Sequence, residues 1–95
     1  MSMRVLPIAI AAAAIFMTGT AADAACFVNS RTSSAENIRL SPAGAIVNRL
    51  RNGRIVFPVL VRNDPRGRPW VYIEGEYQGV WRRWGYIWAG SLTCL

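Results

Sequence analysis

The densest set of residues able to contact a ligand lies in the twelve positions from Gly79 to Gly90, GVWRRWGYIWAG. Three tryptophans and two adjacent arginines occur there. Flat indole rings stack on the faces of sugars and other ligands, and guanidinium groups pair with carboxylates and phosphates. We therefore predict a ligand-binding surface that includes Trp81, Arg82, Arg83 and Trp84. The alternative is that Trp81 or Trp84 folds back over the end of the core, with the arginines stacked on the indole ring.

Two further aromatic side chains complete the predicted binding set. In the run WVYIE, residues 70–74, polar or aromatic residues alternate with aliphatic ones, as in a strand with one buried face. We assign Val71 and Ile73 to the core and Trp70 and Tyr72 to the other face. There Trp70 and Tyr72 either line a ligand groove or support the segment Glu74–Trp84.

The residue types needed for catalysis are largely missing. The chain has no histidine and no lysine, which removes the commonest general base, the serine triad and Schiff-base chemistry. Glu74 and Glu76 could imitate a glycosidase carboxylate pair, but Gly75 between them favours a turn. Two cysteines without histidine make no zinc site. We expect a protein that is not an enzyme and has no cofactor, metal or catalytic residue.

The N-terminal segment has the layout of a secretory signal peptide. Arg4 precedes the apolar run Val5–Met17, which is short for a membrane span, and the small residues Ala22-Asp23-Ala24 form an A-x-A site. We predict a signal peptide over residues 1–24, with cleavage after Ala22 or a retained anchor as alternatives. No large aliphatic residue precedes Cys26, which argues against a lipoprotein. The protein is therefore expected to be exported, either to the periplasm or out of the cell.

The remaining chain, about 71 residues from Ala25 to Leu95, allows one small domain. Its only cysteines, Cys26 and Cys94, lie at its two ends. An oxidising compartment lets a disulfide persist, and a bridge requires that the two ends meet. We predict that Cys26 and Cys94 are joined.

The domain sequence consists of short runs of strand-forming residues separated by Gly, Pro, Asn and Asp, which indicates a small all-β fold. We predict strands at Ala45–Leu50, at Arg54–Val61 with an edge or bulge at Pro58, and around Tyr86–Trp88. Loops are expected at Ser30–Asn37 and Arg62–Pro69, a hairpin turn at Asn52-Gly53, and a flexible excursion at Gly75–Gly79. The predicted aliphatic core is Ile38, Leu40, Ile46, Val47, Leu50, Val56, Val59, Val71 and Ile73.

The order of short motifs resembles the bacterial SH3-like domains of exported and envelope proteins. The matching segments are Asn37–Pro42 (NIRLSP), Arg49–Gly53, Val56–Leu60, Pro69–Ile73, and Gly85–Ile87 followed by Leu92. This resemblance implies a small, bent barrel of five or six short strands, with a binding role at the cell wall. The segment Glu74–Trp84 is longer and more aromatic than the family's usual hairpin, and Pro69 replaces a glycine.

Charge restricts the partners. All eleven basic residues are arginine, and removal of Arg4 and Asp23 leaves ten arginines against four acids, a net charge of +6. For an exported protein rich in arginine, acidic material of the cell envelope is a more plausible partner than nucleic acid. We expect a binding module for peptidoglycan or another acidic envelope glycan, with no membrane span. The alternatives are an unidentified protein partner, an anionic lipid or lipopolysaccharide, or a charge that only keeps the domain soluble.

Overall fold

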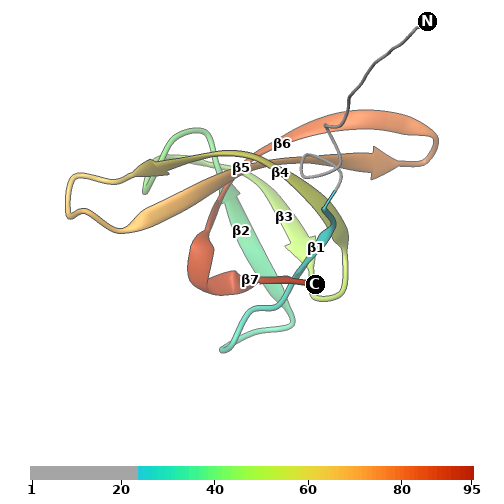
Figure 1. Cartoon of the computed structure of the whole chain (residues 1–95), viewed down its shortest axis with the longest axis horizontal. Coiled ribbons are helices and arrows are strands. Elements are labelled where there is room, and N and C mark those ends of the chain that lie inside the picture. The colour runs from blue at the N-terminus through green and yellow to red at the C-terminus, as the bar shows by residue number, and fades with distance from the viewer. Residues whose placement is uncertain (1–23) are drawn as a thin grey trace, which may run out of the picture.

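The computed structural model describes residues 24–95 as a β-sheet domain (Figure 1). The predicted signal peptide, except Ala24, lies outside the described residues. No helix in residues 24–95 is long and apolar enough to cross a membrane. The strands are β1 (Cys26–Val28), β2 (Ala35–Arg39), β3 (Ile46–Arg51), β4 (Ile55–Asn63), β5 (Pro69–Tyr77), β6 (Val80–Trp88) and β7 (Leu92–Cys94), with a 3-10 turn at Ala89–Ser91 before β7.

All strand pairs are antiparallel, and the seven strands form one sheet in the order β3-β2-β6-β5-β4-β1-β7. The predicted all-β class is confirmed. The predicted number of five or six short strands is wrong, because β1 and β7 add a terminal pair and β4, β5 and β6 are nine residues each. Within the described residues β3 and β7 are the two end strands of the sheet and do not pair with each other, so the sheet is open rather than closed.

Strand β5 connects the two longest hairpins. It crosses the molecule, so that the β4–β5 hairpin extends to one side and the β5–β6 hairpin to the other (Figure 1). The flexible excursion predicted at Gly75–Gly79 is wrong. Gln78 and Gly79 instead form a two-residue turn with φ values of 52° and 80°, the left-handed geometry that suits the twist of a tight hairpin.

Three local predictions can be compared with the strand pairing. A register shift between Pro58 and Leu60 confirms the bulge expected at Pro58. The hairpin at Asn52-Gly53 is wrong, because the turn joins β3 to β4 and these strands pair with other neighbours. The loop predicted over Ser30–Asn37 ends early, because β2 begins at Ala35, which pairs with Arg51 of β3.

The core lies on one side of the sheet. Ile38, Ile73 and Ile87 are fully buried at its centre, and Val71 is buried with Ile73 as predicted. Burial of each such side chain contributes about 1.5–3 kcal/mol. Four predicted core residues are instead exposed: Leu40, Ile46, Val47 and Val59. Leu40 follows the end of β2, Ile46 and Val47 lie on the end strand β3, and Val59 lies at the bulge of β4.

The predicted disulfide is present. Cys26 of β1 and Cys94 of β7 lie opposite each other in the ladder, with their Cα atoms 4.0 Å apart. The strands, the core and this bridge all lie between Cys26 and Cys94.

Candidate functional site

One side of the β4–β5–β6 region carries most of the aromatic side chains. Directly opposed residues of an antiparallel ladder project from the same side of the sheet. Val71, Ile73 and Ile87 face the core, so the residues that alternate with them face away from it. We call this outward side the aromatic face; its members, from β4, β5 and β6, are Phe57, Trp70, Tyr72, Glu74, Trp81, Arg83, Tyr86 and Trp88.

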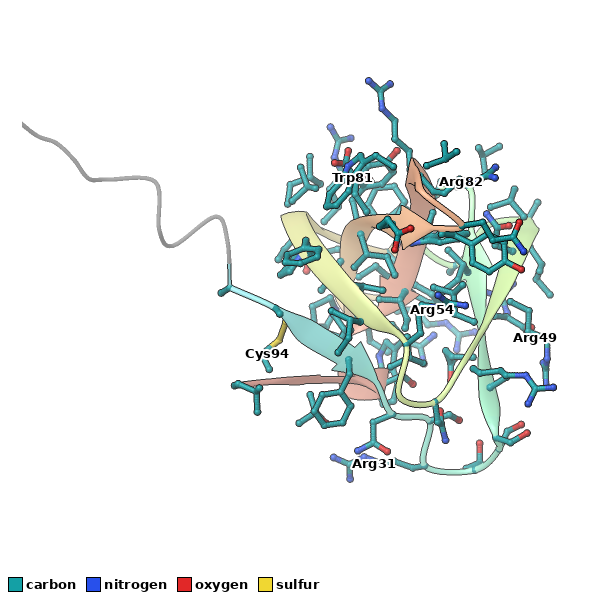
Figure 2. All side chains as sticks on the ribbon, turned by 90° about the vertical axis from the view of Figure 1, so that its right-hand side faces the viewer. Arg31, Arg49, Arg54, Trp81, Arg82 and Cys94 are labelled. Atoms are coloured by element: carbon teal, nitrogen blue, oxygen red, sulfur yellow. A yellow bond between two sulfur atoms is a disulfide. The ribbon has the colours of Figure 1, made fainter. Side chains whose placement is uncertain are left out.

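Contacts between neighbouring rings organise the aromatic face. The rings of Tyr72 and Tyr86 meet edge to face, with centroids 5.2 Å apart. Trp81 lies 5.5 Å from Phe57, and its indole N–H donates to the Glu74 carboxylate at 2.9 Å. Trp81 is 54% exposed and Trp88 38% exposed, so both rings offer surface to a ligand. Figure 2 shows Trp81 at the outside of the molecule.

The carboxylate of Asp64 fixes the loop between β4 and β5 and also holds Trp70. Oδ1 accepts the backbone N–H groups of Arg66 at 2.8 Å and Arg68 at 3.0 Å. Oδ2 accepts the indole N–H of Trp70 at 3.1 Å and Nε of Arg68 at 3.3 Å. These donors, led by the Arg68 backbone N–H, lower the pKa of Asp64 from 3.8 to about 2, although burial acts in the opposite direction. Trp70, 7% exposed, is thereby anchored beneath the face.

The low pKa of Asp64 predicts a specific acid sensitivity. Because the folded state holds this carboxyl's pKa below its ordinary 3.8, its contribution to stability is present above that value and is lost as the pH falls towards about 2. Asp64→Asn should lower the melting temperature near neutral pH, since an amide nitrogen would replace one acceptor oxygen. The difference between wild type and variant should shrink in acid. Thermal unfolding followed by circular dichroism over this pH range measures it; a constant difference would contradict the prediction.

A second cluster lies on the other side of the β5–β6 hairpin. A hollow of about 240 Å³ lies between β3 and this hairpin. We call its lining, together with Arg82 beside Tyr77, the arginine groove. The members of the arginine groove are Arg49, Leu50, Arg51, Arg54, Tyr77, Arg82 and Trp84. The guanidinium carbons of Arg54 and Arg82 lie 4.9 and 5.8 Å from the Tyr77 ring centroid. Figure 2 shows Arg49, Arg54 and Arg82 on the same side of the view.

The four carboxylates of the domain are already engaged. Glu36 accepts the Ser91 hydroxyl, Glu74 the Trp81 indole, and Glu76 the backbone N–H of Gly79. Asp64 makes the only ion pair within residues 24–95, at 3.3 Å to Arg68. In that part of the chain, no group of three acidic, cysteine or histidine side chains could hold a metal ion. Nine of the domain's ten arginines therefore keep guanidinium charge that no carboxylate of the described chain neutralises.

The predicted binding residues are divided between three environments. Tyr72, Trp81 and Arg83 lie on the aromatic face, whereas Arg82 lies across the sheet in the arginine groove. Trp84 is only 8% exposed and belongs to the core, as the folding-back alternative described. Trp70 shares the aromatic face but is covered. The predicted single cluster of Trp81, Arg82, Arg83 and Trp84 is therefore not formed, because adjacent strand residues point to opposite sides.

Sequence reasoning did not assign several residues of these two surfaces to a site. On the aromatic face these are Phe57, Tyr86 and Trp88; in the arginine groove they are Arg49, Arg51, Arg54 and Tyr77. The alternation around Ile87 already indicates that Tyr86 and Trp88 share a side. Their position beside Tyr72 and Trp70 follows only from the register of β5 and β6.

The chain forms a small antiparallel β-domain whose two ends are joined by a disulfide and which carries these two surfaces. Comparison with protein-family models, with curated proteins and with solved structures finds no match to this chain.

Proposed function

We propose that this domain is an exported, non-catalytic binding module that recognises peptidoglycan or another acidic glycan of the cell envelope. The observation that carries the proposal is the aromatic face, where the exposed rings of Trp81 and Trp88 share one side of the sheet with half-buried rings from three strands. Sugar rings present flat C–H faces that pack well on such side chains, while the hydroxyl groups remain solvated. An exposed aromatic cluster of this kind commonly marks an interaction site.

Arginines border the aromatic face on both sides and favour an acidic glycan. Arg62 of β4 lies opposite Trp70, and Arg39 of β2 lies opposite Tyr86. Arg39 is ordered by a hydrogen bond to the Gly44 carbonyl and lies 5.9 Å from the Trp70 ring. Together with Arg83, these guanidinium groups provide partners for carboxylates at the borders of a stacked sugar chain.

Export and a relation to the SH3-like domains are also part of the proposed function. The disulfide supports export, since such bonds persist in oxidising compartments. The segment that resembles SH3-like domains, Asn37–Leu92, runs from within β2 to the first residue of β7. The ends of the domain meet through the pairing of β1 with β7, as the resemblance implies, whereas the open sheet departs from the barrel that it also implies.

The test is co-sedimentation of the oxidised chain from Ala25 with purified peptidoglycan at low and high salt. The double variant Trp81→Ala/Trp88→Ala removes the two most exposed rings of the aromatic face and should weaken binding by roughly tenfold or more. Wild-type binding should persist in high salt, because stacking is screened far less than surface charge.

Tyr77→Ala is the matched control, because Tyr77 is 37% exposed but lies on the other side of the hairpin. It should leave peptidoglycan binding unchanged. The proposal would be wrong if wild type did not bind, if salt abolished binding in every protein alike, or if Tyr77→Ala had the larger effect.

One observation favours a second candidate, a protein-interaction module. Within residues 24–95, strand β4 pairs with β1 only at Ile55 and Val56, and its second half pairs on one side alone, with β5. Val59 and Val61 are exposed there. Such an edge can accept an extended segment of a partner as an added strand. This candidate predicts no binding to purified wall material.

A further inference from the structure

The arginine groove lies where the sheet fails to close. End strand β3 approaches β6, but within residues 24–95 no ladder joins them. The side-chain amide of Asn48 bridges the gap by donating to the Trp84 carbonyl at 2.9 Å. The groove forms beside this bridge, with β3 and the β3–β4 turn on one side and Tyr77 on the other.

Three of the groove's arginines, Arg49, Arg54 and Arg82, make side-chain contacts that orient them. Arg49 is oriented by contacts to Asn37 at 3.1 Å and Ser33 at 3.4 Å. Arg54 and Arg82 lie near the Tyr77 ring, and neither guanidinium group makes an ion pair within the described residues. Ordered donors of this kind lose less entropy when an anion binds.

Charge around the groove is unbalanced. Arg49, Arg51 and Arg54 line the hollow, Arg82 lies beside Tyr77 at its border, and none of the four makes an ion pair within the described residues. Glu76, which lines the neighbouring hollow, accepts the Gly79 N–H and makes no ion pair within the described residues. Like charges gathered in one place repel one another, so an anion with several oxygens and more than one negative charge would relieve this repulsion.

We propose that the arginine groove is a second binding site, separate from the aromatic face, for phosphate groups carried by an anionic ligand. Arginine forks match phosphate oxygens in pairs, and one phosphate can accept from several guanidinium groups at once. A singly charged planar carboxylate would satisfy fewer of them. An adjoining hollow of about 530 Å³ shares Arg51 and Arg54, but it is also lined by Glu76 and by Phe57 of the aromatic face, so the proposed phosphate site is confined to the arginine groove.

The experiment is calorimetric titration of the oxidised chain from Ala25 with inorganic tripolyphosphate. Saturable binding with one ligand per chain is expected, and Arg51→Gln/Arg54→Gln should weaken it at least tenfold. The matched control, Arg31→Gln/Arg66→Gln, removes the same charge elsewhere and should change affinity less than twofold. Arg31 lies far from the groove in Figure 2. Arg51 and Arg54 are not buried, so melting temperatures should confirm that both variants fold.

Further measurements separate the possible sources of the phosphate. Sedimentation with phosphatidic acid vesicles but not phosphatidylcholine vesicles, lost in Arg51→Gln/Arg54→Gln, would assign the phosphate to a lipid headgroup. Tripolyphosphate binding without vesicle binding would assign it to a soluble or polymer-borne group. The proposal would be overturned by absent saturable binding, by equal losses in the two double variants, or by polyglutamate binding as tightly as tripolyphosphate. Trp81→Ala/Trp88→Ala should retain phosphate affinity, which keeps this test independent of the glycan proposal.

Discussion

Replacing Cys26 and Cys94 together with serine is expected to lower the free energy of unfolding by roughly 4 kcal/mol. The two residues are 68 positions apart, so their bond restricts nearly the whole domain in the unfolded state. Domains of this kind have a total stability of only about 5–15 kcal/mol. The folded state is affected as well, because among the described strands β7 pairs only with β1, and both are three residues long.

Urea unfolding of the oxidised wild type and the double serine variant measures this effect. Reduced wild type is the control and should unfold like the variant, since it lacks the same bond. A variant within about 1 kcal/mol of the oxidised protein would mean that the strands hold the domain without the bridge.

Trp84→Ala is expected to cost about 3–5 kcal/mol, the range for removing a large buried aromatic side chain. Trp84 packs in the core and meets Tyr77, with ring centroids 6.1 Å apart. The same substitution at the exposed Trp81 should cost about 1 kcal/mol or less. The two tryptophans, three positions apart in the chain, therefore have different roles: Trp84 stabilises the fold, and Trp81 is available to a ligand.

Trp84→Phe refines this prediction. The indole N–H of Trp84 is the one buried side-chain polar atom in residues 24–95 without a hydrogen-bond partner. Phenylalanine keeps much of the ring and removes this unpaired donor, so it should cost clearly less than alanine. Urea unfolding of the three variants provides the comparison. Equal losses for Trp84→Ala and Trp81→Ala would contradict the assignment of Trp84 to the core.

Local patterns predicted those parts of the fold that depend on neighbours in the chain. The period of two in residues 70–74 placed Val71 and Ile73 in the core correctly, because strand residues alternate between faces. Pro58 predicted a bulge because proline has no N–H for a ladder. The cysteines predicted their bond because no other cysteine was available.

The errors concern pairing between distant segments. The burial of Trp84 depends on a register shift at Ile73 and Glu74, which places one additional β6 residue between Arg83 and Gly85. A shift of one residue moves a side chain to the other face, and no local pattern predicts it. Val47 was expected in the core because it is apolar, but it lies on an end strand that no layer covers.

The residues of the two candidate surfaces are likewise brought together by pairing between distant segments. Arg82 and Arg83 are adjacent in the sequence, yet alternation sends them to opposite sides of β6. The arginine groove combines β3, the following turn and the β5–β6 hairpin, so its composition follows from the tertiary fold. Composition alone could predict that arginine dominates the charge, but not where arginines gather.

The bond between the chain ends also has a mechanical consequence. A pull applied to Ala25 and Leu95 reaches Cys26 and Cys94 first, and the covalent bond between them carries the load. The hydrogen bonds of the inner strands, and with them the aromatic face and the arginine groove, lie outside this path. An oxidised domain held under tension at its two ends would therefore keep both surfaces intact, whereas a reduced one would be unzipped from β1 and β7 inward.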